Sequence, residues 1–381
     1  MVYGSLHGAL RVRRVRSVYG KTRKDVADQL AVLIAKTKAG LPLAVESWTL
    51  ERFADHWLKH MVGPRLRPST LSSYRETLRL HILPTLGGIN LRALTPTHVR
   101  TLLPHKAADG LGARSIQIIH STLRTMLSEA MREELIERNV AKVIRPPSVE
   151  RIEVQPWSTE EASCFLAAAA DHRLHALFAV GVALGLRKGE LLALRWDDVD
   201  LEGGVLHVRQ NVQRLPEMGL VFGPPKSNKS RRTIPLPAAS AKVLRTHRAN
   251  QAAEALALGP AWVDSGLVFT SAAGTVIEPR NLNRFFDELI AKARVRRIRF
   301  HDLRHTCASL LLAQNVPARV VMEILGHSQL AMTTDSHVMP TATGGCGRHG
   351  SPRRFSATAN AVARLMATAI TKLAEIRAFK P

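Results

Sequence analysis

The spacing of apolar residues predicts that the first 140 or so residues are mainly helical. From Lys24 to Ala39 the apolar positions fall on one side of a helix, and Gly40 and Pro42 end the run. Further helices are expected to begin near Thr49, Pro68, Thr95 and Ala113, the last ending near Leu135. A Ser, Thr or Pro at most of these starts is typical helix-entry chemistry. Residues 45–145 are therefore interpreted as an all-helical domain.

A short basic segment precedes this domain. Arginines alternate with Val12 and Val15, a pattern that favours a small strand pair with one charged face. Residues 1–44 are interpreted as a basic DNA-binding region of strand and helix. Its candidate contacts are Arg11, Arg13, Arg14, Arg16, Lys21, Arg23 and Lys24.

The second half of the chain has a mixed pattern. Residues 146–157 are rich in Pro and charge without periodicity, so they are predicted to be a linker. Ser158 and Glu161 have capping-box spacing and open a larger domain over 158–340. In that domain helices are expected over 159–170, 174–184, 238–256, 279–293, 301–313 and 318–325, and strands near 205–209, 232–235 and 267–270. The predicted fold class is α+β, multidomain and mainly helical.

Composition points to a polyanionic partner. Lys and Arg total 54 against 31 acids, which gives a formal net charge of +23. Neutralising phosphates releases condensed counterions, so such a surplus favours nucleic acid. A merely basic soluble protein is the alternative. No apolar run reaches spanning length and no export signal is visible, and the three cysteines have no metal-ligand spacing. We expect a cytoplasmic protein without metal, cofactor or membrane contact.

One helix start in the all-helical domain gathers basic and hydroxyl residues. Arg67, Ser69, Thr70 and Arg75 surround the Pro68 start. Helix N-termini flanked by arginine hold phosphate well, so these four are candidate DNA contacts. An ordinary solvated helix end is the alternative for each residue taken singly.

Three features of the larger domain carry candidate chemistry. Gly185 and Gly189 place Arg187 on a turn, where a guanidinium suits two phosphate oxygens, and Glu190 follows three residues later. Pro224 to Arg232 is predicted to be a hairpin tip on which a lysine could protonate a leaving oxygen. The alternatives are surface charge and a solvated basic loop. Arg231 of this segment is a further candidate DNA contact.

The third feature is a pair of histidine motifs. His301 and Arg304 are three residues apart, so they are expected on one face near a helix start, with His305 following. A metal site through His301 and His305 is the alternative, but no zincin-type glutamate lies between them. Gly326 is expected to end the next helix with His327 just beyond it, where a histidine is commonly only a cap.

The order of these motifs resembles the tyrosine-recombinase, or phage integrase, family over nearly the whole chain, including an N-terminal arm-binding module and a SAM-like core-binding domain. The resemblance implies that Arg187 and Arg304 clamp the scissile phosphate and that Lys226, with Lys229 less favoured, is the general acid. It assigns proton transfer to His301 and a phosphate hydrogen bond to His327, with Glu190 and His305 in support. It also implies double-stranded DNA with att-like sites, a tetramer on DNA, and an excision factor or host DNA-bending protein as partners.

The sequence departs from the family at the nucleophile. The family has a run resembling Thr-Thr-Asp-Thr-Tyr-Ser-His-Val, whereas here Ser336 directly follows Asp335. The chain's tyrosines are Tyr3, Tyr19 and Tyr74, all upstream of the larger domain. Covalent catalysis needs a positioned attacking oxygen, and Ser336 has a shorter and less acidic hydroxyl.

Two interpretations follow from these residues. One is a site-specific recombinase that cuts and rejoins DNA through a 3′-phosphotyrosine. The other is an integrase-derived chain that binds DNA and cannot cleave it, or a degenerate gene product. The tail 341–381 also departs from the family, with a glycine-rich stretch followed by one expected amphipathic helix.

Overall fold

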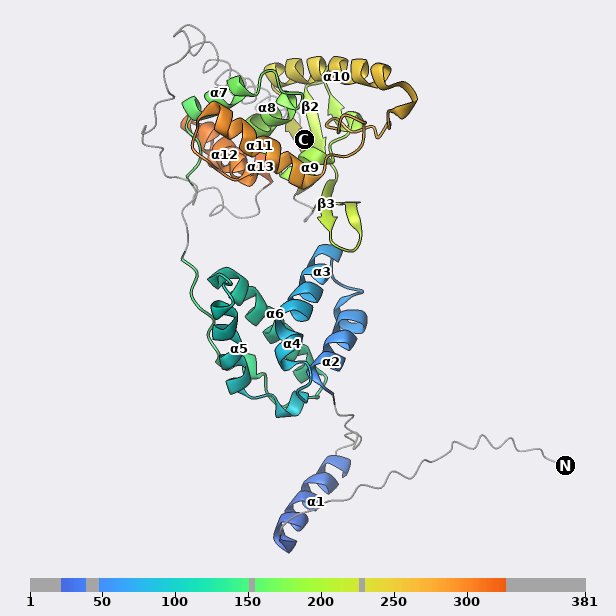
Figure 1. Ribbon diagram of the computed structural model, residues 1–381, viewed down its shortest axis with the longest axis vertical. Coiled ribbons are helices and arrows are strands. Elements are labelled where there is room, and N and C mark those ends of the chain that lie inside the picture. Colours follow the sequence, from blue (N-terminus) through green and yellow to red (C-terminus); the bar gives the residue numbers. More distant parts are fainter. Residues whose placement is uncertain (1–21, 39–47, 151–154, 226–229, 327–381) are drawn as a thin grey trace, which may run out of the picture. The chain divides into compact units, whose positions relative to one another are not determined.

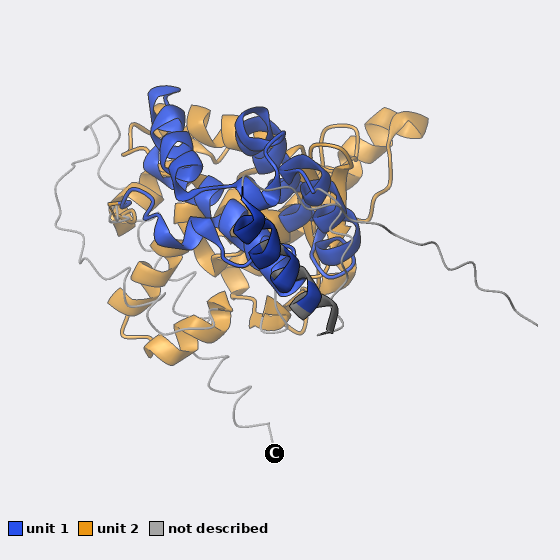
Figure 2. Ribbon diagram, turned by 90° about the horizontal axis from the view of Figure 1, so that it is seen from below, with its two compact units in different colours: residues 1–149 blue, residues 150–381 orange. Residues whose placement is uncertain are grey.

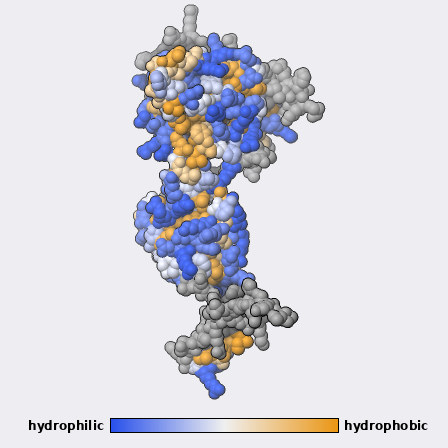
Figure 3. All heavy atoms as spheres, turned by 90° about the vertical axis from the view of Figure 1, so that its right-hand side faces the viewer, coloured by the Kyte–Doolittle hydropathy of each residue, from blue (hydrophilic) through white to orange (hydrophobic). Residues whose placement is uncertain are grey.

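The computed structural model describes residues 22–38, 48–150, 155–225 and 230–326. The chain divides into two compact units, residues 1–149 and 150–381 (Figure 2). Each unit has its own apolar core. Hydrophilic residues cover much of the visible face of each unit, and each unit also shows apolar patches on that face (Figure 3). Among the described residues, no helix has the length and apolar character needed to cross a membrane.

The first unit is helical in its described part, as the apolar spacing predicts. Thr49 caps α2 by accepting a hydrogen bond from the Arg52 N–H at 3.2 Å, and Pro68 occupies the first turn of α3. The helices are α1 (Arg23–Lys38), α2 (Leu50–His56), α3 (Pro68–Thr77), α4 (Leu83–Leu86), α5 (Pro96–Ala108) and α6 (Ala113–Arg132). Short 3₁₀ turns are η3 (Leu91–Ala93) and η4 (Val140–Val143).

Two of these helices continue as π-helix, which the sequence pattern does not predict. The π-helical turns are η1 (Trp57–Val62), after α2, and η2 (Leu78–Ile82), after α3. Trp57 is fully buried and its ring lies 5.1 Å from that of Tyr74, measured between centroids. Tyr74 therefore packs against the core of the first unit, as its apolar neighbours indicate, whereas Tyr3 and Tyr19 lie outside the described residues.

The second unit combines helices with two small sheets (Figure 1). Its helices are α7 (Thr159–Ala168), α8 (His175–Leu184), α9 (Lys188–Leu192), α10 (Ala238–Leu258), α11 (Pro279–Ala293), α12 (Leu303–Ala313) and α13 (Ala318–Leu325). Its 3₁₀ turns are η5 (Trp196–Asp198), η7 (Gly259–Ala261) and η8 (Phe300–Asp302). Its strands are β1 (Val199–Asp200), β2 (Val205–Val208), β3 (Asn211–Leu215), β4 (Gly219–Gly223) and β5 (Arg232–Pro235).

The expected capping box begins the first helix of this unit. The last residue of the predicted linker, however, belongs to the folded unit. Ser158 and Glu161 cap α7 reciprocally. Trp157, which the sequence pattern assigns to the linker, is fully buried. Its indole N–H donates to the Arg296 carbonyl at 2.7 Å, and its backbone N–H donates to Thr306 Oγ1 at 3.1 Å. Trp157 is therefore part of the second core.

The strand pairing corrects the expected hairpin around residue 226. Strands β1, β2 and β5 form one antiparallel sheet, in which His207 pairs with Thr233, while β3 and β4 pair only with each other. The segment before β5 therefore connects two sheets and is not the tip of one hairpin. Within it, residues 226–229, including Lys226 and Lys229, lie outside the described residues.

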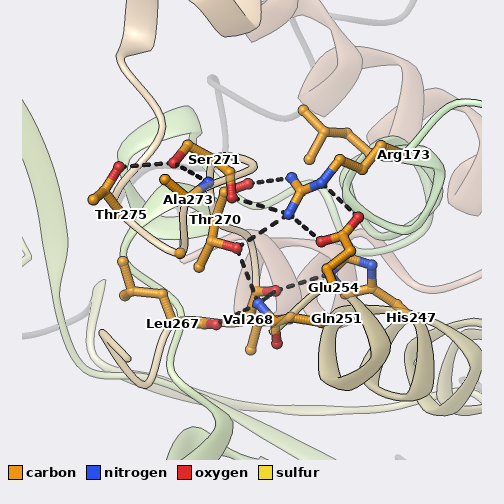
Figure 4. Close-up of polar contacts among 12 residues, drawn as sticks. Arg173, His247, Gln251, Glu254, Leu267, Val268, Thr270, Ser271, Ala273 and Thr275 are labelled. Atoms are coloured by element: carbon orange, nitrogen blue, oxygen red, sulfur yellow. Dashed lines mark hydrogen bonds and ion pairs between the residues drawn. The ribbon is translucent and has the colours of Figure 1, made fainter. Parts of the chain in front are cut away.

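The expected strand at 267–270 is also wrong. Only isolated bridges occur there, from Leu267 to Arg195 and from Thr270 to Val276. Side chains from α10 take the place of a strand partner: His247 Nε2 donates to the Val268 carbonyl at 2.8 Å, and Gln251 Nε2 donates to the Leu267 carbonyl at 3.1 Å. The carbonyls of Leu267 and Val268 are thus satisfied without a ladder (Figure 4).

One arginine completes this polar cluster. Arg173 donates from Nε and Nη2 to the two carboxylate oxygens of Glu254, at 2.8 and 2.6 Å. It also donates to the carbonyl oxygens of Thr270 and Ser271, the latter at 3.0 Å (Figure 4). Arg173 therefore joins the start of α8 to α10 and to the 267–271 segment.

Candidate functional site

A left-handed glycine turns the chain between α8 and α9 and so places Arg187. Gly185 ends α8 with φ +57°, and a Cβ there would lie 2.5 Å from Leu325 Cδ2 and 3.1 Å from Cys307 Cβ. Only glycine fits both the dihedral angle and the space. Arg187 follows as the N-cap of α9, with its side chain 33% exposed. It therefore sits at a helix start, on the turn that the glycines predict.

Glu190 lies beneath this arginine and binds it twice. The Arg187 Nη1 donates to Glu190 Oε1 at 2.7 Å, and the Arg187 backbone N–H donates to Oε2 at 3.0 Å. The Glu190 side chain is only 2% exposed. Burial would raise the pKa of this carboxyl, but Arg232 and Arg187 outweigh burial and hold the pKa below its ordinary value. Glu190 is therefore ionised, and it holds the guanidinium group of Arg187 in place.

Arg304, on the first turn of α12, is the second expected clamp residue and is almost completely covered. Its exposure is 3%. Its Nη1 donates to the Gly185 carbonyl at 2.8 Å, and its Nη2 donates to the Leu325 carbonyl. Burial, with the charges of Arg187 and Arg232, lowers the pKa of Arg304 to about 9. The group is still a cation at neutral pH.

These groups form one electropositive cluster. Arg187, Arg232 and Arg304 surround a single carboxylate, which leaves a net charge of +2. A low local dielectric strengthens the attraction of such a cluster for an anion. Phosphate oxygens are the acceptors that guanidinium groups match best. The arrangement can therefore hold a phosphodiester and stabilise charge that develops on it.

His301 and His305 flank this cluster. His301 lies in η8 and is exposed, whereas Arg304 is buried, so the expected common face is only partly realised. The two imidazole centroids are 6.0 Å apart. Partial burial, Arg304 and His305 lower the pKa of His301; burial also lowers the pKa of His305. Both rings are therefore predominantly neutral near pH 7 and able to accept a proton.

The carboxylate between the two histidines is already occupied. Asp302 accepts hydrogen bonds from the Arg299 backbone N–H at 2.9 Å and from Arg299 Nε at 3.0 Å, and it is 5% exposed. In the described part of the chain, no group of three or more His, Cys, Asp or Glu residues has a geometry that could hold a metal ion. The metal alternative for this motif gains no support.

A groove with several basic groups lies beside His301. Residues of α11 and of the segment that leads into η8 line most of it. Lys188 reaches into it and donates to Asn283 Oδ1 at 3.3 Å, and burial lowers the pKa of the Lys188 ammonium. The basic groups along the groove are Lys188, Arg296, Arg297, Arg299 and His301.

The described structure brings together Arg187, Glu190, Arg304, His301 and His305 of the expected site. His327, Lys226 and the Asp335–Ser336 junction lie outside the described residues, as do Arg11, Arg13, Arg14, Arg16 and Lys21. Arg23, Lys24, Arg67 and Arg231 are exposed, while Ser69, Thr70 and Arg75 are half-buried. Arg232 is a member of the cluster to which the sequence pattern assigns no role.

Comparison with known proteins places these features in a family. Residues 158–337 match the model of the Phage integrase family, and residues 49–106 match that of the Phage integrase, N-terminal SAM-like domain. An integrase of Streptomyces ambofaciens is 31% identical over 341 residues, covering 85% of this chain and 84% of the relative. A XerC-like tyrosine recombinase of Caldanaerobacter subterraneus is 29% identical, covering 85% of this chain and 88% of its own length.

Solved structures share the fold. The Tn1549 transposon integrase, in complex with a circular intermediate DNA, aligns with a TM-score of 0.63 at 17% identity, covering 78% of this chain and 97% of that one. A lambda integrase tetramer bound to a Holliday junction aligns with a TM-score of 0.58 at 19% identity, covering 84% of this chain and 88% of that one. With its two matching domain models and its integrase relatives, the chain belongs to the phage integrase family of tyrosine recombinases.

Proposed function

We propose that this chain binds double-stranded DNA, holds a backbone phosphate between Arg187 and Arg304, and does not cleave it. The observation that carries the proposal is the contrast between an assembled cationic cluster and the missing tyrosine. Arg187, Arg304 and Glu190 have defined partners, yet the sequence passes from Asp335 to Ser336 without the family's nucleophile. Electrostatic stabilisation cannot replace an attacking oxygen.

DNA binding is supported by charge, by position and by relatives. The net charge is +23, and exposed arginines include Arg67 and Arg231. The Tn1549 integrase and the lambda integrase were both solved in complex with DNA. In this proposal residues 1–44 and 45–145 bind duplex DNA, while 158–340 holds the phosphate. Lys226, at the family's general-acid position, and His327, which donates a hydrogen bond to the phosphate, complete the site.

The proposal has consequences for assembly. A tetramer on DNA, as described for lambda integrase, would contain no tyrosine at this position if every subunit were this chain. An identical partner therefore cannot donate the nucleophile, whereas a related intact recombinase could. An excision factor or a host DNA-bending protein is a further proposed partner.

The DNA-binding part is tested with sites selected from a random duplex pool by the full chain. The apparent Kd should rise steeply with salt, because several phosphate contacts release counterions. Arg187→Ala should weaken binding about tenfold and lower the salt slope by about one. Arg245→Ala is the matched control, because Arg245 is exposed and binds Glu202 and the Leu201 carbonyl. Equal effects of the two variants would contradict the proposed phosphate site.

A further inference from the structure

Arg232, on strand β5, joins two parts of the site. Its Nη1 and Nη2 donate to the two oxygens of Glu190 at 3.2 and 3.0 Å, and its Nε donates to the Ile324 carbonyl at 2.7 Å. Its side chain is only 6% exposed. The Arg232 side chain is thus buried, and its hydrogen-bond partners lie inside the protein.

Glu190 shares its charge between two arginines because of this contact. Oε1 accepts from Nη1 of both Arg187 and Arg232, and Oε2 accepts from the Arg187 backbone N–H and from Arg232 Nη2. Without Arg232, this buried carboxylate would have Arg187 as its main cationic partner. The positive charge that Arg187 offers to an anion would then be largely cancelled.

The second contact of Arg232 belongs to a row at the end of α13. Three successive carbonyls each accept a hydrogen bond from a different arginine: Ile324 from Arg232, Leu325 from Arg304, and Gly326 from Arg187 Nη2 at 3.4 Å. Helix C-termini leave carbonyls without intrahelical donors and carry partial negative charge. Of the three donors in this row, Arg232 is the one that does not belong to the proposed phosphate clamp.

We propose that Arg232 is a positioning residue that keeps Arg187 and Arg304 available to a phosphate. It does so by neutralising Glu190 and by holding the C-terminus of α13. The proposal rests on the proposed function and adds to it a residue that acts through Glu190 and Ile324 without touching the anion.

The probe is inorganic sulfate, titrated into the full chain at constant ionic strength and followed by the NMR resonances of ¹⁵N-labelled arginine side chains. Sulfate should shift a subset of these resonances saturably. Arg232→Lys keeps the charge but loses the two-pronged contact, so sulfate affinity should fall about tenfold. Arg173→Lys is the matched control, because Arg173 also binds both oxygens of a glutamate and two carbonyls. Its affinity should stay within about twofold of the unaltered chain.

A charge-matched double variant separates positioning from direct contact. Glu190→Gln with Arg232→Met leaves the charge of the cluster unchanged and removes the Glu190 charge that Arg187 alone would otherwise balance. Arg232→Met alone should bind sulfate at least about tenfold more weakly than the unaltered chain, and the double variant should regain most of that affinity. A double variant as weak as Arg232→Met alone would overturn the proposal, as would an Arg232→Lys variant of normal affinity.

The possible failures are distinguishable. If Arg232→Lys does not fold, thermal unfolding will show it, and the double variant then decides between the same two outcomes. If the unaltered chain binds no sulfate, the proposed phosphate site fails, and the role of Arg232 fails with it. If the unaltered chain binds and only the variants behave otherwise than expected, the proposed function stands and the positioning role alone is wrong.

Discussion

At the scale of single residues, the site depends on how strongly each donor is already engaged. Arg304 is buried and donates to the carbonyls of Gly185 and Leu325. Arg187 is one-third exposed, and its Nη2 meets the Gly326 carbonyl at 3.4 Å, which is longer than a good hydrogen bond. That Nη2 is therefore the donor most easily diverted to a phosphate oxygen.

The lowered pKa of His301 predicts proton uptake on anion binding. An anion beside the ring favours its charged form, so binding raises the pKa of His301 and affinity increases as the pH falls. Sulfate should bind more tightly at pH 6 than at pH 7.5, by about threefold, in titrations at constant ionic strength. His301→Gln should flatten this dependence, whereas His98→Gln, in the first unit, should not. If sulfate affinity depended on pH equally in the two variants, proton uptake by His301 would be contradicted.

Residue types and spacing predict some members of the site and not others. Arg187, Glu190 and Arg304 lie in recognisable motifs, and the structure brings them together. Arg232 is not predicted as a site residue because it lies in a run of basic residues, where a further arginine carries no distinct signal. A signal is nevertheless present: Arg232 and Ile234 are two apart on a strand, so an arginine shares the inward face with a buried isoleucine.

At the scale of elements, the end of α8 is the point on which the arrangement depends. The Gly185 carbonyl accepts a hydrogen bond from Arg304, and a Cβ added at Gly185 would meet side chains of α12 and α13. Helix α12 also packs on α8 and α13. A change at this turn should therefore disturb both the packing and the cationic cluster.

Gly185→Ala should destabilise the second unit by about 2–4 kcal/mol, from a left-handed alanine and from overpacking. The matched control is Gly219→Ala: Gly219 also has a positive φ, +73°, but a Cβ added there would meet no atom within 4 Å. It should cost only about 1 kcal/mol. Urea unfolding measures both. Similar losses of unfolding free energy in the two variants would show that steric overlap at Gly185 contributes nothing.

Local pattern predicts most helices and also strands β2 and β5, which lie where strands are expected, but it is insufficient for the other strands. The 267–270 run is apolar and buried, so the sequence favours a strand, but His247 and Gln251 satisfy its carbonyls from α10. These contacts span about twenty residues, and no local pattern encodes them. The β3–β4 ribbon is not predicted either, although Pro216 and Gly219 frame its turn, a combination typical of three-residue hairpin loops.

At the scale of the whole molecule, the second unit carries histidines with lowered pKa values that link its stability to pH. Burial lowers the pKa of His172, His175, His247, His301 and His305. For a depressed folded-state pKa, the stabilisation is present above the unfolded value, near 6.5, and is lost as the pH falls through the folded value. The second unit should therefore become less stable below about pH 6.5.

His247 is the clearest contributor, because it is 6% exposed and donates to the Val268 carbonyl. His247→Gln keeps an N–H donor and removes the titration. It should reduce the fall in unfolding free energy by up to about 1.4 kcal/mol per pH unit below pH 6.5. Thermal unfolding between pH 5 and 7.5 measures this, and a variant with the unaltered slope would refute the contribution.

We expect the whole chain to bind DNA through its recombinase-type phosphate site without forming a covalent bond to the DNA. The most direct test incubates the full chain with a selected duplex that carries a nick near the crossover, which traps any covalent intermediate. Insertion of Thr-Tyr after Asp335 supplies the missing residue, and insertion of Thr-Phe is its control. Denaturing gels should show a covalent adduct for the Thr-Tyr chain only. An adduct formed by the unaltered chain would contradict the proposed loss of cleavage.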